Sequence, residues 1–204
     1  MVNYLIVLFA ITLVYFASAE RLIIYTRLIA LQGFLLCGIA FFELREVNTA
    51  NLIFIIAESF LFKALLIPYL LVRIIKRSEV TKVHSHAMPG FYLLILSIFA
   101  LLISVILANS LVNPFINTIY LVIALFALFI GLLLIVTHSL IISHLIGFLI
   151  IENAVFIFSL AVGNEMPMLI NIGILLDIFV GVLILGFFGL RLKANTNELT
   201  MLKD

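Results

Sequence analysis

Four ionisable side chains lie deep inside long apolar runs of this chain. They are the side chains best suited to gain or lose a proton within a membrane. They are Glu58, Lys63, Glu152 and Asp177. A charged side chain at the centre of a membrane-spanning helix costs about 2.5–3.5 kcal/mol on insertion scales. Burial disfavours the charged form of each group, so such side chains must be neutral, paired or in contact with water. We therefore predict a proton or ion relay near the middle of the membrane.

The spacing of Glu58 and Lys63 indicates whether their side chains face each other. Glu58 and Lys63 are five residues apart, which in an α-helix turns them about 140° from one another. We therefore expect them to face different partners. Pro68 follows in the same run and is expected to free the carbonyl of Ala64 and to kink the helix.

Two further runs place polar groups beside the acids. Gly173, Asp177 and Gly181 recur every four residues and so share one helix face. Small residues on that face let another backbone approach closely, which predicts that Asp177 points into protein. Glu152 is followed directly by Asn153, so this helix must also bury a polar edge.

Histidines are candidates for the ends of a relay. His138 and His144 bracket a short connection between two apolar runs. An imidazole changes charge near physiological pH, so both are candidates for passing protons to the buried acids; the simpler alternative is that they are interfacial loop residues. His84 and His86 lack the further ligands that a metal site needs. We expect no metal or cofactor in this chain.

The composition excludes most soluble classes of protein. The chain has 204 residues, of which 66% are hydrophobic and 10% charged, whereas soluble domains are about 45–50% apolar and about 25% charged. A single Cys, Cys37, excludes an internal disulfide. The net charge of +1 indicates no nucleic-acid partner. No P-loop, dinucleotide fingerprint or catalytic triad pattern is present, so we expect a protein without catalytic activity of its own.

The apolar runs predict an all-α, polytopic membrane protein. About 20 residues cross a bilayer, and the first run is expected to stay as a helix, since it lacks the marks of a signal peptide. Residues 1–204 are thus expected to form a single transmembrane bundle. The seven predicted spans are residues 2–19, 22–42, 50–73, 90–110, 115–137, 143–163 and 167–190.

The distribution of Lys and Arg predicts the orientation. With seven spans, nine of these residues fall on one side of the membrane, and Lys and Arg favour the cytoplasmic side. The N-terminus is therefore expected outside and the C-terminus inside. The nine are Arg21, Arg27, Arg73, Lys76, Arg77, Lys82, Arg191, Lys193 and Lys203.

The two ends of the chain resemble one another, which indicates an internal repeat. Residues 8–10 (Leu-Phe-Ala) match residues 125–127 at an offset of 117, and Glu58 meets Asp177 at an offset of 119. Because the fourth span returns the chain to its starting side, two three-helix units would have parallel orientation. The predicted units are residues 1–77 and 115–193, joined by one extra helix at 90–110.

Short motifs in the second unit carry a family resemblance. They are Ile146-Gly147-Phe148, Asn153-Ala154, Leu176-Asp177 with Gly181, and Arg191. With these motifs, residues 125–193 resemble the three-helix K-type subunit of respiratory complex I and the C-type subunit of multisubunit sodium/proton antiporters. The whole chain, about twice as long, resembles component E of hydrogenase-4-type complexes.

The resemblance implies roles for some of the buried acids. The K-type subunit carries a carboxylate in each of its last two helices, within the chain of charges that couples redox chemistry to proton movement. Asp177 matches the second position, with Asp in place of the usual Glu. The first position falls on Leu149, and Glu152 follows three residues later. Glu58 and Lys63 have no counterpart in the short subunit.

We therefore expect a non-catalytic subunit of a complex-I-like assembly, of the membrane-bound nickel–iron hydrogenase or formate hydrogenlyase type. The expected location is the cytoplasmic membrane of a prokaryote. The resemblance implies antiporter-like membrane subunits and soluble hydrogenase-like subunits as partners, and it puts the nickel–iron and iron–sulfur centres in those partners. The alternatives are a sodium/proton antiporter subunit and a structural subunit whose buried charges only hold helices together.

Overall fold

The computed structural model describes residues 2–19, 21–43, 53, 55–78, 90–111 and 116–162, together with Leu175, Phe179, Val182 and Gly186. The regular structure of this part is helical. Its elements are α1 (Val2–Ser18), α2 (Leu22–Glu43), the π-helix η1 (Glu58–Leu66) continued by α4 (Ile67–Ser78), α5 (Gly90–Ser110), α6 (Thr118–Thr137) and α7 (Ile141–Val162).

Helix length and hydropathy make this a multi-pass membrane protein. Five helices of the described part are at least 20 residues long and strongly apolar: Leu22–Glu43, Ile55–Lys76, Gly90–Ser110, Thr118–Thr137 and Ile142–Val162. Such helices satisfy their own backbone groups, as the hydrocarbon core requires. α1 is also apolar but shorter, with 17 residues. The helical prediction is therefore confirmed for these segments, and the count of seven spans stays a prediction.

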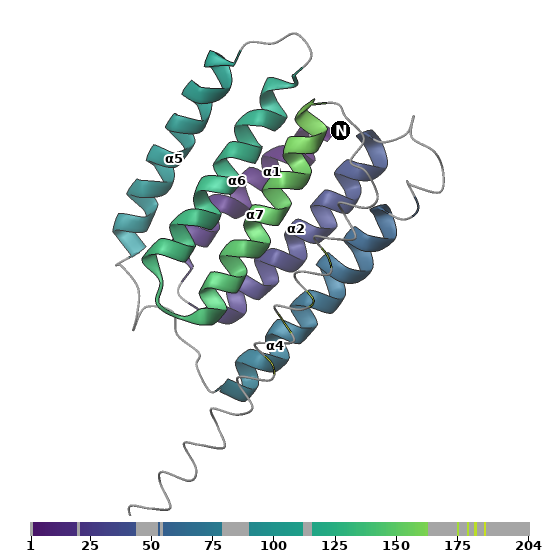
Figure 1. The fold of residues 1–204 in the computed structure, drawn as a ribbon, viewed down its shortest axis with the longest axis vertical. Coiled ribbons are helices and arrows are strands. Elements are labelled where there is room, and N and C mark those ends of the chain that lie inside the picture. Colours follow the sequence, from purple (N-terminus) through teal and green to yellow (C-terminus); the bar gives the residue numbers. More distant parts are fainter. Residues whose placement is uncertain are drawn as a thin grey trace, which may run out of the picture.

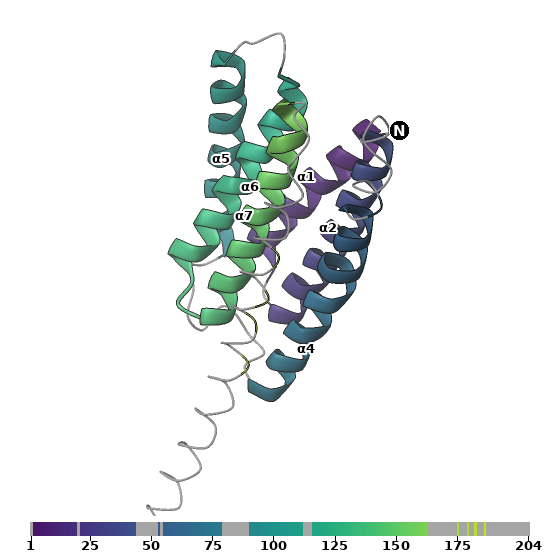
Figure 2. The ribbon, with the colours of Figure 1, turned by 45° about the vertical axis from the view of Figure 1, so that its right-hand side comes forward.

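The helices form two layers (Figure 1). Figure 2 shows α5, α6 and α7 in one layer, α2 and the continuous η1–α4 helix in the other, and α1 running obliquely between them. α2 is central: it packs on α1, on η1–α4 and on α7. Gln32, at the middle of α2, is completely buried by these neighbours.

Contacts at the two ends of the bundle fix the helix directions. Tyr25, at the start of α2, meets His138, at the end of α6. At the other end, Tyr120 of α6 donates a hydrogen bond to Glu43 of α2. The α1–α2 and α6–α7 turns therefore lie at the same end, and α1 runs parallel to α6. Two three-helix units of the same orientation require that their first helices, α1 and α6, run parallel. The division of the chain into such units stays a prediction.

Glycine allows α6 and α7 to pack backbone against backbone. A Cβ atom on Gly131 would lie 2.7 Å from the carbonyl oxygen of Gly147, and a Cβ on Gly147 would lie 2.7 Å from the carbonyl oxygen of Gly131. Small residues at facing positions are the usual means of close helix packing in membranes. This contact sets the position of α7, which carries Glu152.

α5 lies at the edge of the bundle and is the least buried of the five long apolar helices. Its buried residues recur along one stripe and are mostly small: Leu93, Ser97, Ala100, Ser104 and Ala108. The two serine hydroxyls donate to carbonyls of their own helix, those of Leu94 and Ala100. The stripe thus packs on α1 and α6 without an unsatisfied polar group, and the rest of α5 presents large apolar side chains.

The four described residues beyond α7 are helical, and three of them lie against the η1–α4 helix. Leu175, Phe179 and Val182 share a small apolar cavity with residues of η1 and α4, including Phe62 and Leu66. Val182 is buried. The remainder of the seventh predicted span, residues 167–190, lies outside the described residues, together with Asp177, Gly173 and Gly181.

Candidate functional site

A buried ion pair joins the two layers of the bundle. Nζ of Lys63, on η1, lies 2.8 Å from Oε1 of Glu152, on α7. Each residue is only 6% exposed. Within the described part of the chain this carboxylate oxygen accepts no other hydrogen bond, so the ammonium group alone compensates its burial.

Both charges lie at the depth where they are most costly. Glu152 is the central residue of the span Ile142–Val162, and Lys63 lies near the middle of Ile55–Lys76. Removing two such ions from water carries a penalty that only close pairing can offset. The pairing therefore compensates two charges in the hydrocarbon region, where ionisable side chains often mark ion or proton paths.

Lys63 is carried by a π-helix rather than an α-helix. The backbone N–H of Ile67 donates to the carbonyl of Phe62, five residues earlier, at the end of this stretch. The α-helical separation of about 140° predicted between Glu58 and Lys63 is therefore wrong here, because the helix is wider. Pro68 follows at once: it has no N–H to donate and its ring crowds the Ala64 carbonyl, which favours a wider turn before it. Wider turns of this kind recur at functional sites.

Gly33 on α2 lets the π-helix come close enough for the ion pair. A Cβ atom on Gly33 would lie 2.7 Å from the backbone nitrogen of Ala64 and 2.8 Å from the carbonyl carbon of Lys63. Both neighbours are backbone atoms and cannot rotate away. Gly33 therefore positions the backbone of Lys63.

An aromatic ring completes the surroundings of the lysine. The Phe156 ring centroid lies 5.3 Å from the Nζ atom of Lys63. Phe156 is one helical turn from Glu152, so both are on the same face of α7. The negative face of an aromatic ring attracts a cation, and α7 thus offers the ammonium two favourable contacts.

A chain of neutral polar groups runs beside the ion pair. Asn153 Nδ2 donates to Gln32 Oε1 over 3.1 Å, Gln32 Nε2 donates to Thr12 Oγ1 over 2.9 Å, and the Thr12 hydroxyl donates to the carbonyl of Phe9. All three side chains are buried. The chain links α7, α2 and α1 at mid-height, and it contains no group that titrates near neutral pH.

We expect Gln32→Leu to lower the free energy of unfolding by about 1–3 kcal/mol, because it leaves the buried amide of Asn153 without its acceptor. Thermal unfolding of the purified chain in detergent measures the change. The double variant Gln32→Leu/Asn153→Leu is the control. It removes donor and acceptor together and should recover most of the loss. A single variant as stable as the wild type would contradict the expectation.

The two predicted histidines lie together at the α6–α7 turn. His138 Nδ1 is 3.1 Å from the Leu134 carbonyl, so this nitrogen carries the proton, and Nε2 is left to accept from the Tyr25 hydroxyl at 3.4 Å. His144 Nε2 donates to the His138 carbonyl over 2.6 Å. His138 is buried at this end of the bundle, in the connection between α6 and α7, so its position fits either interpretation, a relay group or an interfacial loop residue.

The structure does not bring these histidines to the ion pair. His144 and Glu152 are eight residues apart on α7, which is about 12 Å along the helix. Their part in a proton path stays a prediction.

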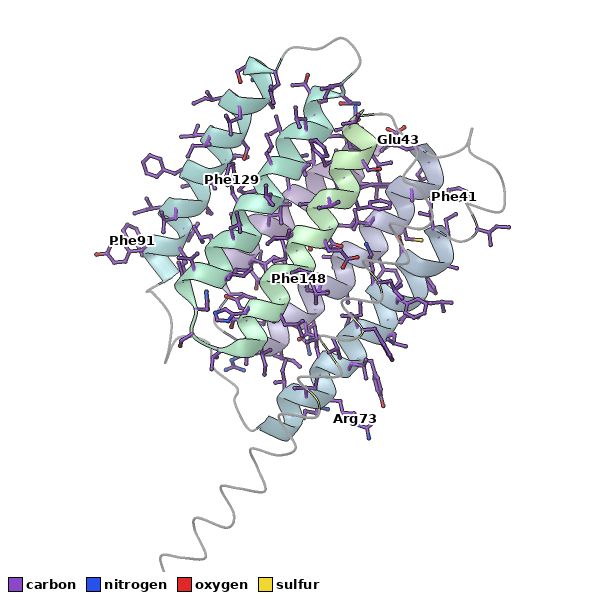
Figure 3. All side chains as sticks on the ribbon, viewed as in Figure 1. Phe41, Glu43, Arg73, Phe91, Phe129 and Phe148 are labelled. Atoms are coloured by element: carbon purple, nitrogen blue, oxygen red, sulfur yellow. The ribbon has the colours of Figure 1, made fainter. Side chains whose placement is uncertain are left out.

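At the other end of the bundle, the carboxylate of Glu43 accepts a hydrogen bond from the hydroxyl of Tyr120. Figure 3 shows Glu43 and Arg73 at opposite ends of the bundle.

Of the four predicted groups, the structure places two in contact. For Glu58 the backbone is described and the side chain is not, and Asp177 lies outside the described residues. Leu149, which the resemblance matches to the first carboxylate position of the K-type subunit, is buried among apolar residues. Gln32 was not among the residues predicted from the sequence. Its position could have indicated a role, because an amide at the centre of an apolar run needs a hydrogen-bonding partner within the protein.

Among the described residues, no three His, Cys, Asp or Glu side chains gather in a way that could hold a metal ion. Comparisons with protein-family models, with curated proteins and with solved structures found no match.

Proposed function

We propose that this chain is a non-catalytic membrane subunit of a complex-I-like energy-converting assembly. In this proposal it contributes buried charges to proton translocation or coupling, and redox chemistry takes place in partner subunits. The type of assembly is that of membrane-bound nickel–iron hydrogenases and formate hydrogenlyases, and it rests on the sequence resemblance. The observation that carries the role in ion movement is the ion pair between Lys63 and Glu152 at mid-membrane.

The chemistry of the pair suits a relay. A proton delivered to Glu152 would neutralise the carboxylate and remove the attraction that holds the ammonium of Lys63. Without that attraction the buried ammonium is less stable, which favours transfer of its proton to the next group in the row. Glu58 and Asp177 are the proposed neighbours in that row, on the strength of their positions in the sequence.

The predicted repeat supports a specialised role for the pair. By the offsets of 119 and 117, Lys63 corresponds to Val182 and Glu152 corresponds to Leu35. Both counterparts are buried apolar residues. A bundle that packs the equivalent positions without charge does not need an ion pair to hold its helices, which weighs against the purely structural alternative.

Pumping by the assembled complex tests the proposal. We expect Glu152→Gln to reduce proton translocation about tenfold or more while the soluble redox reaction continues, because the amide keeps the shape but cannot take up a proton; positioned proton-transfer groups contribute at least that much to rate. Translocation is measured in vesicles with a pH-sensitive dye, and electron transfer is measured in parallel. The control is Gln32→Leu/Asn153→Leu, which alters the same region and should pump normally.

The reversed pair Lys63→Glu/Glu152→Lys separates relay from structural support. It keeps the attraction between helices, so the complex should assemble, but it exchanges acid and base along the path. Normal pumping by both the reversed pair and Glu152→Gln would show that the charges serve packing alone. Partners that co-purify in mild detergent decide the type of assembly: hydrogenase-like subunits support the proposal, and antiporter subunits without them support the alternative.

A further inference from the structure

The exposed side of the η1–α4 helix changes from apolar to cationic along a single stripe. Leu61, Leu65 and Tyr69 are 53%, 45% and 65% exposed. They are spaced four residues apart and therefore share one face. Arg73 continues the stripe one turn later, followed by Lys76, and both are exposed. Figure 3 shows Arg73 at the end of the bundle, reaching away from the helices.

The apolar part of the stripe is hollowed. An open groove of about 580 Å³ runs along the helix and is lined by Leu61, Phe62, Leu65, Leu66 and Tyr69. Phe62 and Leu66 also border the cavity shared with Phe179. The groove is therefore a shallow apolar surface that extends over about two turns of one helix.

The depth of the groove fits half a bilayer. Leu61 is two residues from Lys63, near the middle of the span Ile55–Lys76. Arg73 lies twelve residues beyond Leu61, which is about 18 Å at the α-helical rise and somewhat less here because residues 61–66 are in the wider π-helix; half of the hydrocarbon core is about 15 Å thick. Arg73 and Lys76 thus lie at the level of the lipid headgroups, with the aromatic ring of Tyr69 just inside them.

The charged side chains that the structure describes at this end are all of one sign. The exposed charged side chains described there are Arg21, Arg27, Arg73 and Lys76. The two carboxylates whose side chains are described, Glu43 and Glu152, lie at the opposite end and at mid-height. Arginine forms paired hydrogen bonds with phosphate oxygens, and lysine adds a point charge.

We propose that this groove is a binding site for a phospholipid with an anionic headgroup. One acyl chain lies along Leu61, Leu65 and Tyr69, and Arg73 and Lys76 hold the headgroup phosphate. The site prefers an anionic headgroup because a zwitterionic one brings its own cation toward the two basic side chains. The proposal does not depend on the function proposed above.

Native mass spectrometry of the purified full-length chain tests the site. The probes are phosphatidylglycerol and phosphatidylcholine with identical acyl chains. We expect the wild type to retain phosphatidylglycerol roughly tenfold more strongly, from two basic side chains at the headgroup. Arg73→Gln/Lys76→Gln should bring that ratio close to one. Both residues are exposed, so the substitutions should leave folding intact.

Matched controls decide between a site and a general surface effect. Arg21→Gln/Arg27→Gln removes the same charge from the same end and should leave the lipid preference unchanged. Leu65→Trp fills the groove and should reduce retention of both lipids. Inorganic phosphate should not displace the bound lipid, because it has no acyl chain. The proposal is overturned if the Arg73/Lys76 variant keeps its preference, or if the Arg21/Arg27 variant loses as much.

A photo-crosslinking residue at position 65 provides an independent check. In native membranes it should label lipid. Labelling of a partner protein there would show that a protein helix covers the groove, and this too would overturn the proposal.

Discussion

Replacing Lys63 with methionine is expected to lower the free energy of unfolding of this chain by about 3–5 kcal/mol, the usual cost of breaking a buried ion pair from one side. The variant leaves Oε1 of Glu152, at the centre of α7, buried and without a hydrogen-bonding partner in the described part of the chain. Unfolding of the purified protein in mixed detergent micelles measures the loss. An equal loss in the exposed-site control Lys76→Met would contradict the prediction.

The double variant Lys63→Met/Glu152→Leu tests the physical reason. Removing both charges also removes the cost of taking them out of water, and such replacements are often neutral or stabilising in proteins. The two single variants and the double variant form a thermodynamic cycle whose coupling energy isolates the pair. A double variant that loses the sum of the single losses would show that the two side chains do not interact.

Adding a single methyl group at Gly33 is expected to lower the free energy of unfolding by about 1–3 kcal/mol, the usual cost of overpacking. In Gly33→Ala the new Cβ would lie 2.7 Å from the backbone nitrogen of Ala64, so η1 must move away from α2. This movement outweighs the gain of about 0.8–1 kcal/mol that alanine brings to a helix. Unfolding in mixed micelles measures the net change.

Other glycines of the same chain supply the controls. Among the described residues, a Cβ on Gly186 would meet no atom within 4 Å, and a Cβ on Gly38 would meet only the side-chain tip of Leu5 at 3.2 Å. Alanine at either position should be neutral or slightly stabilising. Because η1 carries Lys63, Gly33→Ala should also reduce the coupling energy between Lys63 and Glu152. An unchanged coupling energy would show that Gly33 does not position the lysine.

Much of the fold could be predicted because hydropathy acts locally. A helix in hydrocarbon satisfies its own backbone hydrogen bonds, so a sufficiently long apolar run specifies its own secondary structure. The predicted span 90–110 coincides with α5, and the predicted span 22–42 differs from α2 by one residue. The same local reasoning identified Lys63 and Glu152 as costly residues that required compensation.

The partners of those residues could not be predicted, because they depend on how the helices pack. Lys63 and Glu152 are far apart in the sequence and meet only because η1 packs on α2 and α2 packs on α7. Gln32 likewise gains its role from Asn153, on a helix from the other end of the chain.

The sequence by itself determined which segments are helices and which side chains carry a penalty in the membrane. The tertiary structure decided how those penalties are offset. It supplied the π-helix around Lys63, the close approach at Gly33 and the backbone contact between Gly131 and Gly147. The physical reason is that hydrophobic transfer depends on each residue and its neighbours in the run, whereas ion pairing and close packing depend on distances between separate helices.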